Sequence, residues 1–318
     1  MHGEALAPHP TLLVDTVFDD EHLRRACLRG DLVRVVAGRY VRRKHWERFD
    51  ARERYAMLSL AAHSRLRGPV VLSHASAAAL WGFPRLGPWP DVAHVIDSSL
   101  ERSRKSRYVS QHRGSVPLEQ VLEAHGVLVT SPVRTAVDLA LSAPFRQAVT
   151  ALDHGLRSGL FTKDDLHRVL ADLPSDHARK KASKAIEFAD ARANRPGESL
   201  SRVLMHEGGL VAPVLQKRFE GPQGQSAEVD AFFEEVGAVG EFDGMTKYRD
   251  SGRWSGLPPE EVVVQEKLRE DWLRRHPEVR AFVRWTWADL RVPGRLVRLL
   301  RDAGVPLESA RFHGKRAS

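Results

Sequence analysis

The segment 226–248, SAEVDAFFEEVGAVGEFDGMTKY, constrains the fold of this chain more than any other stretch. Its pattern predicts two short strands, 226–233 and 236–243, joined by a tight turn at Glu234 and Glu235. Side chains alternate between the two faces of a strand, so Glu241 and Asp243 are expected on one face of the second strand. If the strands pair, Asp230 brings a third carboxylate towards the same place. The segment therefore predicts an antiparallel hairpin with clustered acids.

Clustered carboxylates repel one another unless a positive charge lies among them. A hard divalent cation, Mg²⁺ or Mn²⁺, meets that need because its preferred ligands are oxygen atoms. The alternative is a solvated acidic face, which is the commoner state of one side of an antiparallel hairpin. Apolar neighbours surround Asp230 and Glu241 in the sequence, which favours burial, and buried acids need partners. We therefore expect Asp230 and Glu241 to be metal ligands.

The charge balance indicates the class of partner. Lys and Arg number 49 against 41 Asp and Glu, giving a formal net charge of +8 and a pI near 9.9. Such a balance favours a polyanion, either a nucleic acid or an anionic membrane surface. No apolar run approaches the ~18 residues of a membrane span and no signal-peptide pattern opens the chain, so we expect a cytoplasmic protein. The single Cys27 argues against a disulfide framework or a Cys-rich zinc site. The 15 histidines form no HExxH-type pair and are expected in the core or on the surface.

The first region, 1–65, is predicted to be a winged-helix-like domain. Asp19 and Asp20 can cap a helix that Gly30 ends, and a hairpin with strands 32–36 and 39–42 follows. A helix followed by a basic hairpin resembles the recognition helix and wing of a winged helix-turn-helix, although any small αβ unit with surface arginines shows the same pattern. Basic wings contact phosphates, so the expected DNA-binding residues are Arg34, Arg39, Arg42, Arg43 and Lys44.

The middle region, 66–175, is predicted to be an α+β domain. Strands are expected at 91–96 and 107–112, and the loop between them carries Arg102, Arg104 and Lys105. This loop is either a solvated charge run or a phosphate contact. Helices are expected to begin at Pro132, with Ser131 as the cap, and behind a capping box at 162–165. The remaining residues, 176–318, are predicted to form a C-terminal restriction-endonuclease-like α/β domain, so the whole chain is α+β and multidomain.

The order of elements in 196–300 resembles the PD-(D/E)xK nuclease superfamily, and within it the domains similar to very-short-patch-repair endonucleases. The residues that carry the resemblance are Glu198 in the first helix, Gln216 and Asp230 in the first two strands, and Glu241-Phe242-Asp243-Gly244 in the third. The resemblance implies a DNA endonuclease in which Asp230 and Glu241 hold the metal, with Glu198 and Asp243 placing waters or a second ion. Asp243 stands where the motif has its lysine, so Lys247 or Lys267 would have to supply that charge.

Three stretches in the first two-thirds of the chain resemble the AbiEi-type antitoxins of type IV toxin-antitoxin systems. They are GDLVRVVAGRYV (30–41), VLSHASAAALWG (71–82) and VTSPVRTAVDLA (129–140). This resemblance implies DNA binding, but it does not tell whether a toxin is present, so a cognate toxin is a candidate partner only. No membrane partner is expected. Two functions therefore stay open: a metal-dependent endonuclease, and an antitoxin or transcriptional repressor whose nuclease fold is inactive. A third alternative is an interaction protein with a scaffold role, which the positive charge disfavours.

Overall fold

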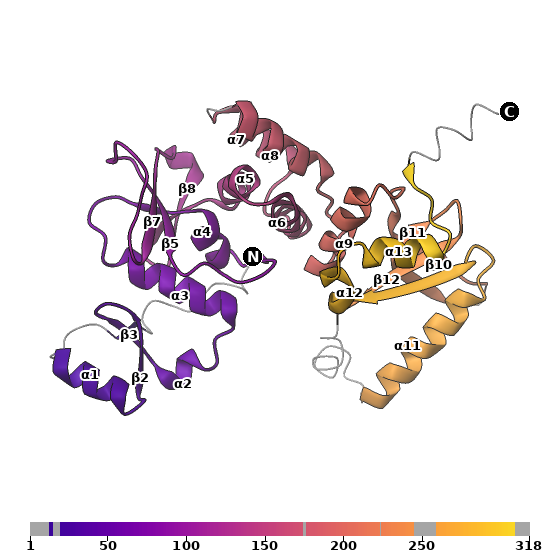
Figure 1. Ribbon diagram of the computed structural model, residues 1–318, viewed down its shortest axis with the longest axis horizontal. Coiled ribbons are helices and arrows are strands. Elements are labelled where there is room, and N and C mark those ends of the chain that lie inside the picture. The colour runs from indigo at the N-terminus through magenta and orange to yellow at the C-terminus, as the bar shows by residue number, and fades with distance from the viewer. Residues whose placement is uncertain (1–12, 15–19, 174–175, 223, 245–258, 309–318) are drawn as a thin grey trace. The chain divides into compact units, whose positions relative to one another are not determined.

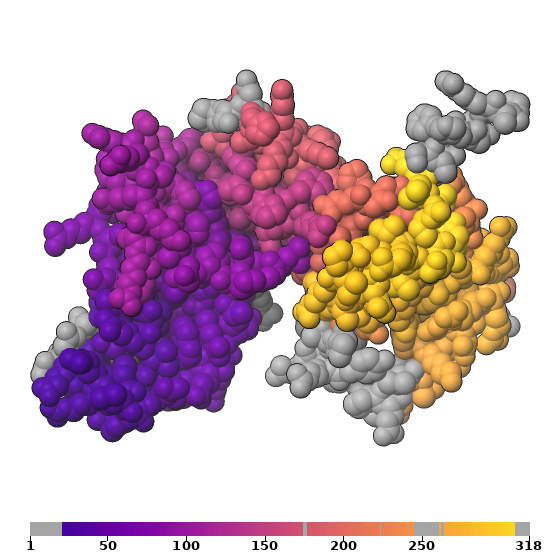
Figure 2. Space-filling model, viewed as in Figure 1, coloured from indigo at the N-terminus to yellow at the C-terminus, as the bar shows by residue number. Residues whose placement is uncertain are grey.

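The chain divides into two compact units, Met1–Ala189 and Asp190–Ser318. The structure is a computed structural model that describes residues 13–14, 20–173, 176–222, 224–244 and 259–308. The first unit runs from indigo to rose in Figure 1 and the second from orange to yellow, and Figure 2 shows the same units as surfaces. Both units combine helices with a sheet, so the predicted α+β class is confirmed.

A small antiparallel sheet opens the first unit. Its strands are β1 (Leu13–Val14), β2 (Leu32–Val36) and β3 (Arg39–Arg42), in the order β1-β3-β2. Helix α1 (Asp20–Leu28) precedes the β2–β3 hairpin, and α2 (Arg43–Trp46) and α3 (Ala51–His63) follow it. Gly38 has a φ of +72° in the hairpin turn, a conformation that favours glycine. A capping box of Asp50 and Glu53 starts α3. The predicted helix and hairpin are therefore both present.

A six-stranded mixed sheet forms the centre of the first unit, in the order β6-β7-β5-β4-β9-β8. Its strands are β4 (Val71–Leu72), β5 (Ala93–Asp97), β6 (Arg104–Lys105), β7 (Val109–Arg113), β8 (Val121–Ala124) and β9 (Val127–Thr130). The pairs β5–β7 and β4–β9 are parallel. Helices α3 and α4 (His74–Leu80) pack on β5, and their alanines and leucines share a buried core with the strands. The strands predicted at 91–96 and 107–112 are confirmed as β5 and β7.

Four helices complete the first unit: α5 (Pro132–Ser142), α6 (Phe145–Arg157), α7 (Lys163–Ala171) and α8 (Asp176–Phe188). The predicted starts of α5 and α7 are confirmed. The Ser131 side chain caps α5 with Pro132 in its first turn, and a Thr162–Asp165 capping box starts α7. Helix α8 packs against α5, α6 and α7, so the compact unit continues to Ala189 and not only to residue 175, the predicted end of the middle domain.

The second unit is a four-stranded sheet, in the order β10-β11-β12-β13, with helices packed on both faces. Its elements are α9 (Pro196–Glu207), β10 (Val214–Glu220), β11 (Ser226–Phe233), β12 (Ala238–Asp243), α11 (Pro259–Arg274), β13 (Ala281–Thr286), α12 (Trp287–Arg291) and α13 (Arg295–Asp302). The β11–β12 hairpin is antiparallel, as predicted, and β12–β13 is parallel. Met205 of α9 and Leu296 of α13 share one core with Trp285, whereas Leu273 of α11 shares another with Val239. Strand β12 is therefore covered on both faces.

Candidate nucleic-acid interface and acidic cluster

The β2–β3 hairpin holds three of the five residues predicted to bind DNA, and the other two, Arg43 and Lys44, lie in the first turn of α2 rather than on the hairpin. The contacts of the five residues divide them into two groups. Arg39 Nε donates to Ser64 Oγ at 2.8 Å, and Arg43 Nε donates to the Gly30 carbonyl at 2.5 Å. These two arginines tie the hairpin to α3 and to the end of α1. The others have exposed side chains without a hydrogen bond or ion pair to another residue in the described part of the chain: Arg34, Arg42 and Lys44. These three cations are available to a ligand.

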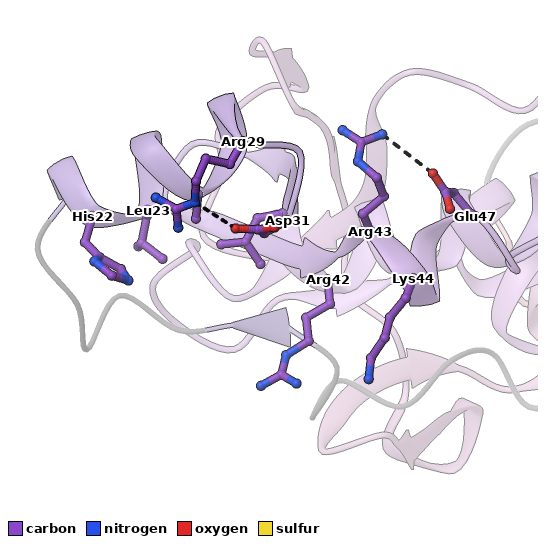
Figure 3. A pocket seen from close by; sticks show the side chains of 10 residues that line it. His22, Leu23, Arg29, Asp31, Arg42, Arg43, Lys44 and Glu47 are labelled. Carbon is purple, nitrogen blue, oxygen red and sulfur yellow. Dashed lines mark hydrogen bonds and ion pairs between the residues drawn. The ribbon is translucent and has the colours of Figure 1, made fainter.

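A hollow of about 700 Å³ lies between α1, the hairpin and α2. Four cationic and two acidic side chains line it, so its charge is positive: Arg29, Arg42, Arg43, Lys44, Asp31 and Glu47. Figure 3 shows ion pairs that join Arg29 to Asp31 and Arg43 to Glu47, whereas Arg42 and Lys44 extend together away from both pairs. Unpaired cations that line a hollow are suited to bind an anionic group such as a phosphate.

Glu241 lies at the centre of the predicted acidic site, and arginines occupy both of its oxygens. Its side chain is 6% exposed on β12. Arg269 Nη2 of α11 donates to one oxygen at 2.9 Å, and Arg284 Nη2 of β13 donates to the other at 3.2 Å. Burial acts to lower the pKa of Arg269, but the adjacent Glu241 carboxylate, with Glu266 and Asp230, outweighs burial and raises it. Both guanidinium groups thus stay charged and neutralise Glu241.

Asp230 and Glu198 have other partners. Asp230 Oδ2 accepts the Phe242 backbone N–H at 2.8 Å, and Asp230 lines a small cavity beside Glu198 on the α9 side of the sheet. Glu198 Oε2 accepts the Asn194 N–H at 2.8 Å and Gln216 Nε2 at 3.3 Å. Gln216 itself has a φ of +51° in β10, in the left-handed region that non-glycine residues rarely adopt. Asp230 and Glu198 therefore hold backbone and side-chain donors around the start of α9.

The remaining residues of the predicted site do not complete a metal centre. Asp243 Oδ1 is buried without a hydrogen-bond partner among the described residues, Lys267 is exposed on α11, and Lys247 lies outside the described residues. In the ranges that the structure describes, no three His, Cys, Asp or Glu side chains are placed to hold a metal ion. The predicted carboxylate ligands do not fit Mg²⁺, because the guanidinium groups of Arg269 and Arg284 already bind both oxygens of Glu241.

Sequence reasoning missed Arg269 and Arg284, which decide the chemistry of the acidic cluster. They lie 28 and 43 residues from Glu241 along the chain. Arg284 faces Glu241 only because β13 pairs with β12 in parallel and in this register. No sequence motif predicts that β12 and β13 pair in this register.

Sequence reasoning also missed a cluster of three histidines in the first unit. His94 Nδ1 and His112 Nε2 lie 3.0 Å apart, and the rings of His74 and His112 stack with centroids 4.2 Å apart. Burial, and then the neighbouring imidazoles, lower the pKa of His74 and of His94 to about 3. Asp138 lies near His112, and burial raises its pKa despite its ion pair with Arg134. The three imidazoles are therefore neutral at neutral pH. Their spacing in the sequence shows no regular pattern.

The region that contains this histidine cluster is similar to a known protein family. Residues 70–188 match the family model of the AbiEi antitoxin C-terminal domain. We call residues 70–188 the AbiEi-like domain. It includes the six-stranded sheet and helices α4 to α8. The resemblance carried by the 71–82 and 129–140 stretches is thereby confirmed for this domain.

The chain also has two relatives of similar length in Mycobacterium tuberculosis, one from strain CDC 1551 / Oshkosh and one from strain H37Rv, both described as uncharacterized proteins. It is 27% identical to each over 255 residues, which cover 78% of this chain and 89% of each relative. The similarity thus extends well beyond the AbiEi-like domain. Separately, none of the helices in the described ranges combines the length and the apolar character that a bilayer crossing requires.

Proposed function

We propose that the protein is a DNA-binding transcriptional regulator of the AbiEi antitoxin type. The observation that carries this proposal is the AbiEi-like domain at residues 70–188, which α2 and α3 connect to the basic hairpin. Three cations of the hairpin and of α2 are exposed and unpaired among the described residues. The net charge of +8 supports a polyanionic ligand. A cognate toxin is the protein partner that this family suggests.

In this proposal the β2–β3 hairpin and the first turn of α2 bind the DNA backbone. Arg34, Arg42 and Lys44 supply the phosphate contacts, while Arg39 and Arg43 hold the hairpin in place through Ser64 and Gly30. Phosphate contacts position a protein on a duplex and are weakened by salt, because each releases bound counterions.

Binding to the protein's own promoter tests this proposal. We expect Arg42→Ala/Lys44→Ala to bind promoter DNA more weakly than the native protein, with the slope of log K against log salt reduced by about 0.9 for each lost phosphate contact. Arg157→Ala/Arg168→Ala removes two exposed cations of α6 and α7 and is the charge-matched control. Equal affinity and equal slope for both double variants and the native protein would contradict the proposal.

A metal-dependent endonuclease is the second candidate. The order α9-β10-β11-β12-α11-β13, with a mixed sheet of four strands, favours it because this is the element order of the nuclease resemblance. The two arginines on Glu241 oppose it, and we therefore propose that the second unit keeps the fold without the hydrolysis. Supercoiled plasmid incubated with Mg²⁺ or Mn²⁺ distinguishes the candidates. We expect no nicking by the native protein, whereas nicking that Glu241→Gln abolishes would establish the endonuclease.

A further inference from the structure

A second group of cations without acidic partners lies on the β6–β7 hairpin of the AbiEi-like domain. We call this hairpin, residues 101–113, the basic ribbon. All of its cations are exposed, and none forms an ion pair with a described acid: Arg102, Arg104, Lys105, Arg107 and Arg113. The one acid within the ribbon is Glu101. A charge excess of this size on one short hairpin is concentrated enough to attract a polyanion.

The ladder fixes which of these cations share a face. Arg104 pairs with Gln111 and Lys105 with Ser110 in antiparallel register. Residues opposite each other, and residues two apart on a strand, point to the same side. Arg104 and Arg113 therefore share the face of Gln111, and Lys105 lies on the other. The Arg113 N–H donates to Ser103 Oγ at 2.8 Å, which continues the pairing towards Arg102.

The Arg104 guanidinium is held in place by a chain of hydrogen bonds that begins in the core. Arg104 Nε donates to Gln111 Oε1 at 2.7 Å, and Gln111 Nε2 donates to Asp97 Oδ2 at 3.1 Å. Gln111 and Asp97 are 6% and 7% exposed. A fixed guanidinium loses little conformational freedom when it binds, and its planar donors match a phosphate.

Protection of the sheet edge is the alternative explanation, since β6 is an edge strand and charged side chains on such strands prevent pairing with other chains. Edge protection requires charge alone. It does not account for the buried Gln111–Asp97 support beneath Arg104, which fixes a direction for the guanidinium.

We propose that the basic ribbon is a second nucleic-acid contact, which binds the phosphate backbone of duplex DNA without reading its sequence. This inference rests on the proposed DNA-binding function and adds to it a contact on the AbiEi-like domain, separate from the β2–β3 hairpin. The ribbon and the hairpin belong to the same compact unit.

The experiment measures binding of the full chain to two duplexes of equal length, its own promoter and an unrelated sequence, between about 50 and about 200 mM salt. Two ribbon variants are compared, Arg104→Gln/Arg113→Gln and Arg102→Gln/Lys105→Gln. The second leaves the Arg104–Gln111–Asp97 support intact, so a loss of folding cannot explain its result. Arg104→Lys/Arg113→Lys keeps the charge and is the matched control.

We expect each Gln variant to bind more weakly than the native protein, by the same factor for the promoter and for the unrelated duplex. The slope of log K against log salt should fall by about 0.9 per lost contact. The Lys control should keep the native slope. Native affinity and slope in both Gln variants, together with weakened binding by Arg42→Ala/Lys44→Ala, would overturn the ribbon proposal and leave the proposed function standing. Weakened binding to the promoter alone would also overturn it, because backbone contacts do not depend on sequence. If the native protein bound neither duplex, both proposals would fail.

Discussion

At the residue scale, Glu241 has the environment of a structural ion pair. A buried carboxylate that binds two guanidinium groups is satisfied as it stands, and a metal ion would have to displace both arginines to use its oxygens. Arg284 also pairs with Glu270 at 3.0 Å, so α11, β12 and β13 are joined through charged side chains. These contacts give Glu241 a role in stability that does not require catalysis.

Glu241→Gln tests this role. The substitution preserves the volume of the side chain and removes its charge, so Arg269 and Arg284 lose a charge-assisted acceptor. We expect the free energy of unfolding to fall by about 1.5–3 kcal/mol, measured by denaturant titration. Glu228→Gln, at an exposed position of β11, is the control and is expected to change stability by less than about 0.5 kcal/mol. A melting temperature of the native protein that rises with Mg²⁺ would contradict our account of the site.

The histidine cluster gives the first unit a dependence on pH. In the folded protein the pKa values of His74 and His94 are about 3, whereas in the unfolded chain they return to about 6.5. Between these two pKa values the unfolded chain therefore binds more protons than the folded protein. The free energy of unfolding that the neutral histidines contribute is complete above about pH 6.5 and is lost as the pH falls towards 3. The loss is up to about 1.4 kcal/mol per pH unit for each histidine.

Amide hydrogen exchange in β5 and β7, followed from pH 7 to lower pH, measures this effect. We expect protection corrected for intrinsic exchange to fall below about pH 6.5 in the native protein and to fall less steeply in His94→Gln. His177→Gln, at an exposed position of α8, should follow the native curve. Parallel curves for all three proteins would show that the cluster does not control stability.

At the element scale, the close approach of α9 to β12 decides how the second unit packs. A Cβ atom on Gly197 would lie 2.1 Å from the Phe242 ring, and one on Gly240 would lie 2.8 Å from Trp285. Trp285 Nε1 also donates to Ser201 Oγ of α9 at 2.7 Å. The first turn of α9 thus contacts the sheet directly, with glycine leaving the space for the aromatic rings.

Gly197→Ala is expected to destabilise the second unit by about 1–3 kcal/mol, because the added methyl overlaps Phe242 in a packed core. Gly114→Ala is the control, since its added Cβ would lie at an ordinary contact distance of 3.6 Å from Ile96. Denaturant unfolding of both variants measures the difference. An unchanged midpoint for Gly197→Ala would mean that α9 shifts on the sheet without cost.

At the scale of the whole molecule, the residues proposed to bind DNA and the acidic cluster lie in different compact units. Every cation invoked for DNA binding lies in Met1–Ala189, and the acidic cluster lies in Asp190–Ser318. The AbiEi-like domain ends at residue 188, one residue before the end of the first unit. Nothing in the proposed DNA contact requires the second unit.

Residues 1–189 expressed alone are therefore expected to bind promoter DNA with the salt slope of the full chain, within the precision of a fluorescence-anisotropy titration. The same fragment carrying Arg42→Ala/Lys44→Ala should show the reduced slope. A fragment that folds, as judged by its circular dichroism, but has a shallower slope than the full chain would show that the second unit supplies phosphate contacts of its own.

The sequence by itself determined the local elements of this protein. The strands at 226–233 and within 236–243, the start of α5 at Pro132 and the capping box of α7 were all predicted, because caps and side-chain alternation depend on neighbours along the chain. The AbiEi resemblance was likewise carried by short contiguous stretches. Only the tertiary structure decided which distant side chains meet: Arg269 and Arg284 on Glu241, and His94 against His112. Those contacts depend on strand register and helix packing, so acids that resemble a metal site in sequence are bound by arginines in the fold.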